Sequence, residues 1–347
     1  RDAPGLAQAY ACAGAAERLR PGLALVRQGL FYDPAGERVD PASAQSLCRG
    51  FVSASRLETY NACPFRYLAE YGIQAAPREL YAERPADEGS FYHDGLDALL
   101  RRIRHAGMEF AAMTDGDVDV LVDELLPSLL ERHNQGYLTA SGRTRARGRK
   151  LASTLKTSAR AMVRQLSLGS FRPALSEAAF GPNAPFAALP LCGDVALVGR
   201  IDRLDEATVD GQTYLRVVDY KRGDVTFDFA ELYAGLRLQL PLYLRAALEQ
   251  GGALPAGMYY QRVYDPVLGP EQDDAELLGE YRLTGVSLDE ASALAAAGAA
   301  NGVRGNPVLP PALADEGQLA ALMAYARAKA AGTVAAIRSG NAPAAPY

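Results

Sequence analysis

The segment VVDYKRG at residues 217–223 places charged side chains at the end of an apolar run. In a strand, residues two apart lie on the same face, so Asp219 and Lys221 are expected to project together. A carboxylate and an ammonium group on such a strand are costly to bury unless they are paired or bind a metal. The segment therefore indicates either a simple ion pair or a site for chemistry.

A second carboxylate lies in the preceding strand-like segment, VGRIDRLD. Asp202 comes 17 residues before Asp219 (219 − 202), a spacing that suits neighbouring antiparallel strands joined by a short turn. Two adjacent carboxylates repel each other unless a divalent cation lies between them, and hard oxygen ligands suit Mg²⁺ or Mn²⁺. The alternative is an ordinary surface ion pair between Asp219 and Lys221, because Asp-x-Lys is short and common by chance.

Four further polar residues are candidates for the same site: His93, Glu177, Gln239 and Tyr243. His93 shares the apolar face of an expected helix, where a lone histidine is usually structural. Gln239 and Tyr243 lie on the apolar stripe of another helix, and a buried glutamine needs partners, which the backbone could supply. Glu177 lies in mid-strand, where a glutamate is expected to face solvent.

The order of the elements predicts a mixture of helices and strands. Helices are expected at 53–71, 87–106, 117–136 and 146–168, followed by strands at 174–181, 186–191, 194–204 and 213–221. The strands are short, rich in Val, Leu and Tyr, and are expected to form a meander. A helix at 228–250, a strand at 256–264 and helices at 288–300 and 316–339 complete the pattern. Ser55 and Glu58 have the spacing of a capping box at the start of the first helix.

Composition narrows the class of protein. Of the 347 residues, 49% are hydrophobic and 22% are charged, which predicts a globular chain with a substantial core. No apolar stretch is long enough to span a membrane, and the first residues have no signal-peptide pattern. The first residue is Arg1 rather than Met, so the chain is expected to be part of something longer. No Walker motif occurs, so an ATP-driven motor is not expected here.

The four cysteines, at positions 12, 48, 63 and 192, are too few and too scattered for a disulfide scaffold, and none forms a CxxC pair. A reducing, cytoplasmic environment is expected. The net charge of −5 gives no global argument for nucleic-acid binding, although a local basic stripe can suffice.

Six segments, taken in order, resemble the RecB-type branch of the PD-(D/E)xK nucleases, and most of all the nuclease domains of AddB subunits of AddAB helicase–nucleases. They are SASRLETYNACPFRYL, GSFYHDGLDALL, LSEAAF, VGRIDRLD, LRVVDYKRG and YAGLRLQLPLYLRAA. The resemblance covers about residues 51–264. It implies an α/β (α+β) fold of the restriction-endonuclease-like PD-(D/E)xK kind: a central mixed sheet flanked by helices, with added helical segments.

The resemblance also implies roles for individual residues. Asp202 and Asp219 resemble the metal-binding acids of the family, and Lys221 resembles the motif lysine. His93 matches the helical histidine that adds a metal ligand, and the backbone carbonyl of Tyr220 is a further expected ligand.

Supporting positions follow from the same motifs. Glu177 matches an acidic position of the active site, and Gln239 and Tyr243 match a QxxxY motif that supports the site and contacts the DNA strand. A separate basic run could follow DNA phosphates, although such runs are usually solvated helix faces. It comprises Arg143, Arg145, Arg147, Arg149 and Lys150.

The function implied is divalent-metal-dependent hydrolysis of DNA phosphodiester bonds by an exonuclease. One or two Mg²⁺ or Mn²⁺ ions would activate water and neutralise the phosphate, and Lys221 would orient the water. An AddA-like helicase subunit is the expected partner, in double-strand break repair and recombination. The alternatives are a catalytically silent DNA-binding or structural module and a stand-alone Cas4-like nuclease.

Cys63, in the CPF segment, matches one of four ligands to a [4Fe–4S] cluster in AddB-like nucleases. The other three follow there as a CxxC pair and a further cysteine near the C-terminus, and this sequence has no cysteine after Cys192. A cluster is therefore expected only in a longer native chain. Without one, Cys63 would be a buried free thiol.

Three regions are predicted along the chain. Residues 1–50 lead in from a preceding region. Residues 51–264 form the nuclease domain, with a helical part at 53–168 and a sheet core at 174–264. Residues 265–347 form a C-terminal helical extension.

Overall fold

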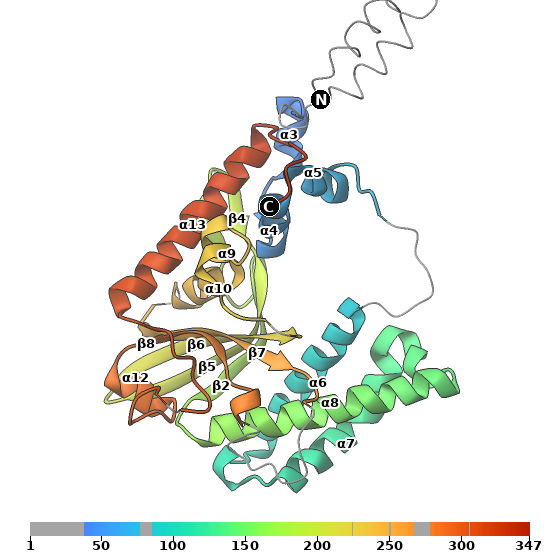
Figure 1. Ribbon diagram of the computed structural model, residues 1–347, viewed down its shortest axis with the longest axis vertical. Coiled ribbons are helices and arrows are strands. Elements are labelled where there is room, and N and C mark those ends of the chain that lie inside the picture. Colours follow the sequence, from blue (N-terminus) through green and yellow to red (C-terminus); the bar gives the residue numbers. More distant parts are fainter. Residues whose placement is uncertain (1–37, 77–84, 224, 250, 267–277, 305) are drawn as a thin grey trace, which may run out of the picture.

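Two groups of helices enclose a mixed β-sheet in the computed structural model (Figure 1). The structure describes residues 38–76, 85–223, 225–249, 251–266, 278–304 and 306–347. Cys12 lies outside these ranges. In the described part of the chain, no helix is both long and apolar enough to cross a membrane.

The main sheet has six strands in the order β2-β5-β6-β7-β8-β9. The β6–β7 and β8–β9 pairs are parallel and the other three pairs are antiparallel, which confirms the prediction of a mixed sheet. The strands are β2 (Arg172–Phe180), β5 (Gly199–Val209), β6 (Gln212–Arg222), β7 (Ala253–Val263), β8 (Thr284–Leu288) and β9 (Leu313–Ala314).

The β5–β6 hairpin is specified locally. Asp210 and Gly211 connect the strands and both have positive φ, 50° and 80°, as the two-residue turn between twisted antiparallel strands requires. Seven consecutive residues of β6, from Tyr214 to Tyr220, are buried. Burial of both faces is expected of a central strand that is covered by helices on each side.

A second, three-stranded sheet corrects the predicted meander. It has the order β1-β4-β3, with β1 (Phe51–Val52), β4 (Val195–Leu197) and β3 (Leu189–Cys192). The expected strand at 194–204 is therefore two strands that belong to different sheets. The strands β3 and β4, which lie between β2 and β5 in sequence, are not part of the main sheet, and β2 pairs directly with β5.

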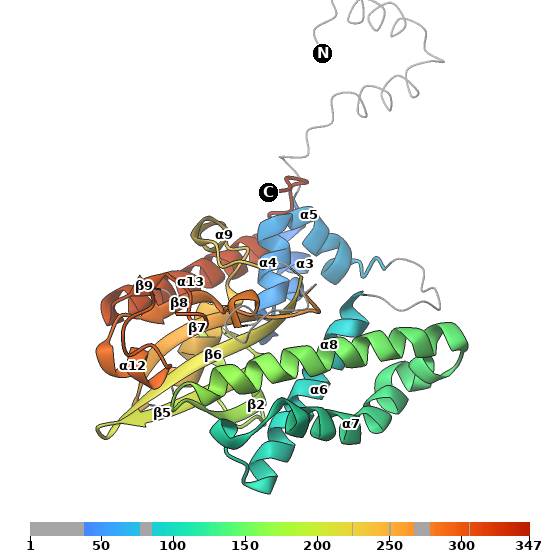
Figure 2. The same cartoon turned by 60° about the horizontal axis from the view of Figure 1, so that its bottom comes forward.

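One group of helices covers the β6–β7 side through a separate apolar cluster, to which Tyr220 and Val263 of the sheet contribute. Figures 1 and 2 show this group together on one side of the molecule. It comprises α6 (Pro85–Ala106), η4 (Phe110–Ala112), α7 (Asp115–Arg132), η5 (His133–Thr139) and α8 (Gly142–Ser167).

The other group packs on the opposite side, where α10 contacts β6 and β7, and α13 contacts α3, α4 and α10. It comprises α3 (Pro41–Leu47), α4 (Ala54–Ala62), α5 (Pro64–Tyr67), the π-helical turn η3 (Leu68–Gly72), α9 (Phe229–Ala234), α10 (Gln239–Leu248) and α13 (Glu316–Arg338). A short helix, α12 (Ala291–Ala296), packs against β5 and β8.

Two expected helices are interrupted. The helix at 53–71 breaks at Cys63, whose backbone is extended (φ −166°, ψ 110°), and Pro64 then opens α5, where a missing N–H costs nothing. The helix at 228–250 ends its first part at Gly235, whose φ of 86° gives a left-handed cap. The capping box was wrong as well: Ser53, not Ser55, caps α4 by accepting a hydrogen bond from the Arg56 N–H.

Residues 265–347 are only partly helical. They supply β8 and β9 to the main sheet in addition to α12 and α13. The strands lengthen the sheet beyond β7, and α13 lies across the helices of the N-terminal segment. The boundary at residue 264 stays a prediction.

A buried ion network lies within the main sheet. Asp205 is fully buried between two arginines: its Oδ1 lies 3.0 Å from Arg203 Nε, and its Oδ2 accepts a hydrogen bond of 2.9 Å from Arg216 Nε. Arg203 also donates to Gln261 Oε1 at 2.8 Å and to the Tyr220 hydroxyl at 3.4 Å. One carboxylate therefore pairs with two buried guanidinium groups, one from β5 and one from β6, the strand that carries Asp219 and Lys221.

We expect Asp205→Asn to lower the free energy of unfolding by about 3–5 kcal/mol, because it leaves two buried arginines without a counter-charge. Urea denaturation followed by circular dichroism measures the change. Asp194→Asn is the matched control, since Asp194 forms an exposed ion pair with Arg338 and its loss should change stability little. Equal effects of the two substitutions would contradict this account of the network.

Candidate active site

Three carboxylates lie in a row across neighbouring strands. The β2–β5 register pairs Ser176 with Arg203 and Ala178 with Ile201, which places Glu177 opposite Asp202. The β5–β6 register ends at Arg203 and Val218, and one further step places Asp202 opposite Asp219. Opposed residues of antiparallel strands share a face. The spacing argument for Asp202 and Asp219 is therefore confirmed, and a third acid joins them.

The Asp202 side chain also replaces a backbone carbonyl as the hydrogen-bond acceptor of the Tyr220 N–H. Its Oδ2 accepts a hydrogen bond of 2.8 Å from the Tyr220 N–H, at the point where the paired register of β5 and β6 ends. Asp202 is 7% exposed, so this bond satisfies both a buried carboxylate oxygen and a buried N–H.

Glu177 does not face solvent, so the default expectation for this residue was wrong. Its side chain is 16% exposed, with Oε1 3.6 Å from His93 Nδ1 and Oε2 accepting a bond of 3.3 Å from Arg200. The Glu177 backbone has φ of 51°, which is strained for a residue other than glycine, at a cost of about 1–3 kcal/mol. This conformation within β2 accompanies the inward direction of the carboxylate.

His93 lies on α6, on the face whose Leu96 and Leu100 are buried. Its Nδ1 is 3.4 Å from Asp202 Oδ1, and its Nε2 is 3.1 Å from the Tyr220 carbonyl oxygen. Burial by itself lowers the pKa of His93, but the contacts of its Nδ1 with the Asp202 and Glu177 carboxylates and the charges of Asp202 and Asp219 outweigh it and raise the pKa to about 10. Because both ring nitrogens face oxygen atoms, the metal-free imidazole is held in its protonated form.

These residues fit a divalent metal. One ligand atom from each of His93, Glu177 and Asp202 lies within 4.8 Å of the others. Glu177 Oε1 is buried and has no hydrogen-bond partner among the described residues, which leaves an oxygen lone pair directed at the site. Carboxylate and carbonyl oxygens with one imidazole suit Mg²⁺ or Mn²⁺. The acids face His93 Nδ1, whereas the Tyr220 carbonyl faces Nε2 on the other side of the imidazole ring.

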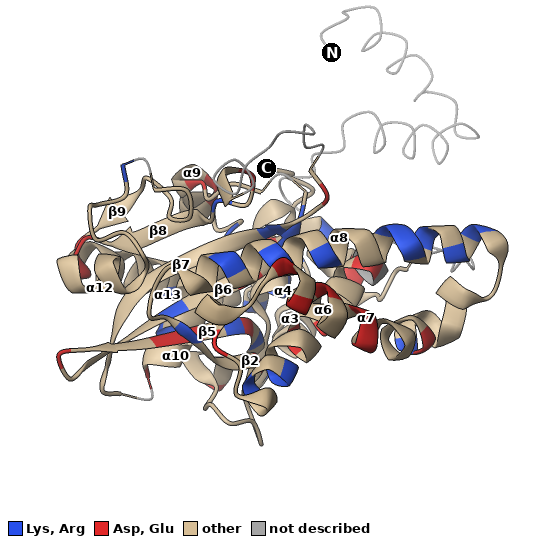
Figure 3. Cartoon of the chain, turned by 90° about the horizontal axis from the view of Figure 1, so that it is seen from below, with Lys and Arg blue, Asp and Glu red and all other residues tan. Residues whose placement is uncertain are grey.

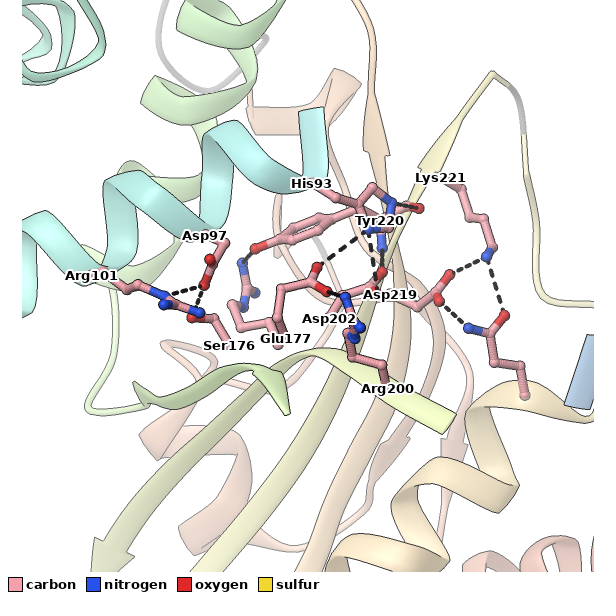
Figure 4. Close-up of polar contacts among 12 residues, drawn as sticks. His93, Asp97, Arg101, Ser176, Glu177, Arg200, Asp202, Asp219, Tyr220 and Lys221 are labelled. Carbon is pink, nitrogen blue, oxygen red and sulfur yellow. Dashed lines mark hydrogen bonds and ion pairs between the residues drawn. The ribbon is translucent and has the colours of Figure 1, made fainter. Parts of the chain in front are cut away.

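The Asp219 carboxylate is turned away from that cluster. Its Oδ2 lies 2.6 Å from Lys221 Nζ, its Oδ1 accepts a bond of 2.5 Å from Gln239 Nε2, and Lys221 Nζ donates to Gln239 Oε1 at 3.2 Å (Figure 4). Burial and the charge of Asp202 raise the pKa of Asp219 to about 7, although Lys221 opposes the rise. The pair is not an ordinary surface ion pair, because the Asp219 side chain is only 4% exposed. Direct binding of a metal by Asp219 stays a prediction.

Glu58 is a contributor that sequence reasoning missed. Its Oε1 accepts hydrogen bonds from the N–H groups of Leu238 (2.7 Å) and Gln239 (3.1 Å), so it caps the start of α10 from another helix. Burial raises the pKa of Glu58 against the effect of these bonds and of Lys221. A capping box that started at Ser53 would need an acid or amide at position 56, which is Arg56. Because Ser53 is the cap of α4, Glu58 takes no part in capping that helix and can bond elsewhere.

Tyr243 supports the start of β5 from behind. Its ring packs edge-on against Phe180 at 5.2 Å, and a Cβ on Gly199 would lie 2.7 Å from its hydroxyl. Gly199 therefore allows the close approach of β5 to α10, three residues before Asp202. Tyr243 is 8% exposed, which favours the supporting role over contact with DNA.

The basic run lies on α8, along which Lys and Arg residues are distributed (Figure 3). Arg147 forms an ion pair with buried Glu88, and Arg222 at the end of β6 pairs with the same carboxylate. The other members of the run, Arg143, Arg145, Arg149 and Lys150, are exposed. Cys63 lies apart from the acids, partly buried between α4 and α5.

Comparison with known proteins gives the same family as the one that the sequence motifs resemble. A family profile described as "PD-(D/E)XK nuclease superfamily" matches residues 52–347. Relatives named as the AddB subunit of an ATP-dependent helicase/deoxyribonuclease occur in Desulforudis audaxviator (35% identical over 96% of this chain and 31% of the relative) and Moorella thermoacetica (33% identical over 89% and 30%). Another, from Exiguobacterium sibiricum, is 33% identical over 80% of this chain and 26% of its own. The chain thus spans less than a third of the length of these relatives.

We expect Glu58→Ala to lower the free energy of unfolding by about 1–3 kcal/mol, because the N–H groups of Leu238 and Gln239 lose their acceptor. Glu58→Gln keeps an acceptor oxygen and should restore most of this loss. Urea denaturation compares the two. Glu124→Ala is the control, since Glu124 forms only an exposed pair with Arg102. Equal stability of the Ala and Gln variants would show that Glu58 does not cap α10.

We expect Mn²⁺ binding at pH 7.5 to release about one proton, because His93, with a pKa of about 10, is protonated until a metal displaces the proton. Isothermal titration calorimetry in Tris and in HEPES measures the release, since the two buffers have different heats of ionisation. His93→Ala should abolish it and weaken binding by at least about tenfold. Identical heats in the two buffers would contradict the protonated state.

Proposed function

Because this chain belongs to the PD-(D/E)XK nuclease superfamily, we propose that it hydrolyses phosphodiester bonds of DNA with the help of a divalent metal ion. The observation that carries the proposal is the row of Glu177, Asp202 and Asp219 across three strands, with His93 facing it from α6. A row of buried acids beside a histidine is costly in a protein that has no use for a cation. We infer Mg²⁺ or Mn²⁺ as the cofactor.

His93, Glu177 and Asp202 would hold the metal, and the Tyr220 carbonyl and Asp219 are further proposed ligands. When bound, a divalent ion lowers the pKa of a water molecule and neutralises charge on the phosphate. Asp202 has a second task, because its bond to the Tyr220 N–H fixes the Tyr220 peptide and with it the direction of the carbonyl.

Lys221 is the residue that acts on water and phosphate. Its side chain is 29% exposed, and its ammonium group is held between Asp219 Oδ2 and Gln239 Oε1, so its direction is fixed before substrate arrives. Held in this way, it would orient the attacking water and donate a hydrogen bond to negative charge that develops on the phosphate. Gln239 bonds both Asp219 and Lys221 and keeps the two side chains in register. Glu58 and Tyr243 are positioning residues that act through α10.

The biological setting is inferred from the relatives. Their printed names combine a helicase with a deoxyribonuclease, and this chain matches less than a third of their length. We infer that it serves as the nuclease part of such an assembly, an exonuclease acting on DNA ends beside an AddA-like helicase partner, in repair and recombination. Cys48, Cys63 and Cys192 form no disulfide within the described residues, which fits a reducing cytoplasm.

The [4Fe–4S] cluster remains conditional on a longer chain. A cluster of this kind needs four ligands, and Cys63 is the one that this sequence supplies at an expected position. The C-terminal residues lie beside it: Tyr347 N–H donates to the Ala62 carbonyl, and Phe65 N–H donates to the Pro343 carbonyl (Figure 1). Cysteines following Tyr347 in a longer protein would reach Cys63, and iron analysis of such a protein tests this. No step of the proposed hydrolysis depends on the cluster.

Nucleotide release from linear single- and double-stranded DNA, with Mg²⁺, Mn²⁺ or EDTA, tests the function. We expect cleavage that needs metal and that falls at least about 100-fold in two variants: Asp219→Ala, which removes a proposed metal ligand and the partner of Lys221, and Lys221→Met, which removes the ammonium group directed at the phosphate. Asp123→Ala, which breaks only an exposed pair with Lys156, should leave the rate unchanged.

Cleavage that survives Asp219→Ala would place the active site elsewhere. If the chain binds metal without cleaving DNA, the same assay on the complete helicase–nuclease decides between dependence on a partner and a binding-only role. Loss of activity in the complex on Asp219→Ala would support the first, and an unchanged rate would support the second.

A further inference from the structure

Two adjoining hollows lie beside His93 and Lys221 of the site. The smaller, of about 190 Å³, is lined by His93, Tyr220 and Lys221 of the site. The larger, of about 550 Å³, is lined by residues of α6, α8 and the ends of β6 and β7. Tyr92, Arg222 and Val263 line both, so the two hollows adjoin, and together they are called the groove here.

Cations from two elements line the larger hollow. Arg147 and Lys150 come from α8 and Arg222 from the end of β6, against the acids Glu88 and Asp265. Glu88 is buried, with a side chain 6% exposed, and pairs with both Arg147 and Arg222. It therefore holds the two guanidinium groups on the same wall, while Arg147 and Arg222 remain 49% and 41% exposed.

We propose that this groove binds the phosphates of a single DNA strand and guides it from Arg147, Lys150 and Arg222 to the acids. The inference rests on the proposed function and adds the path of the substrate. Among the described residues that line the larger hollow, three cations stand against two acids, a balance that suits a phosphodiester backbone. The hollow beside His93 is the smaller of the two, about 190 Å³, and one strand is the occupant that we infer for it.

The groove also divides the basic run into two sets. Arg147 and Lys150 line it, whereas Arg143, Arg145 and Arg149 do not. Arg149 and Lys150 are adjacent, both exposed and equally charged, but successive residues of a helix point in different directions. They form a matched pair for substitution, because they differ in position only in that Lys150 lines the groove and Arg149 does not.

The test measures binding of the chain to a fluorescent single-stranded oligothymidylate by anisotropy, in EDTA so that no cleavage occurs, between 50 and 200 mM NaCl. Each lost phosphate contact should flatten the slope of log affinity against log salt by about 0.7. We expect a change of about 0.7 for Lys150→Ala and about 1.4 for the double variant Arg147→Ala, Lys150→Ala. Arg149→Ala should leave the slope unchanged, and Lys150→Glu should weaken binding far more than Arg149→Glu.

Equal slopes for the Arg149 and Lys150 variants would overturn the proposal that the groove binds DNA. They would indicate that the positive charge of α8 attracts DNA without a defined contact. Failure of the folded wild-type chain to bind the oligonucleotide would overturn it too. Thermal melting checks that each variant is folded. The proposed function is tested separately: a chain that binds through the groove but never cleaves, even in the complex, would refute the nuclease and leave the groove standing.

Discussion

Repulsion between Glu177, Asp202 and Asp219 is the constraint on which the site depends. The sheet brings the three carboxylates onto one row, and without compensation their mutual repulsion and burial would open it. Glu177 and Asp202 share His93, Glu177 also pairs with Arg200, and Asp219 pairs with Lys221 and bonds Gln239. In the metal-free protein this leaves a protonated imidazole where a cation is expected to bind. The raised pKa values of His93 and Asp219 are two results of the same crowding.

The compensating groups come from opposite sides of the sheet. His93 belongs to the helical group of α6, α7 and α8, whereas Gln239 belongs to α10 in the other group, whose start Glu58 of α4 caps. Tyr220 joins the two, because its backbone bonds Asp202 and faces His93 while its ring enters the apolar cluster of α6–α8. The Tyr220 hydroxyl also meets Arg203 of the buried ion network. The site is therefore complete only when both layers have packed, which makes it dependent on contacts between residues far apart in sequence.

Sequence reasoning succeeded where the governing rules are local. Alternation along a strand and the hairpin spacing placed Asp202 beside Asp219, and helical periodicity placed His93 on a buried face. It failed where distant chain segments compete for the same group. Glu58 caps a helix 180 residues away, for which no spacing rule exists. Glu177 faces inward with a backbone conformation that its residue type does not predict. The strands β3 and β4 do not belong to the predicted meander, because β4 pairs with β1, far upstream in sequence, and forms a second sheet with it and β3.

The positive φ of Glu177 has a consequence for the evolution of the family. A glutamate there keeps a strained backbone, whereas glycine or asparagine would relieve the strain and lose the carboxylate. Selection for stability alone therefore pulls this position away from an acid, and only selection for the chemistry holds it. Among relatives, glutamate at this position should mark lineages that still cut DNA. Its replacement by glycine or asparagine, which adopt the left-handed conformation readily, should be an early sign that a nuclease has lost its activity and kept a structural role.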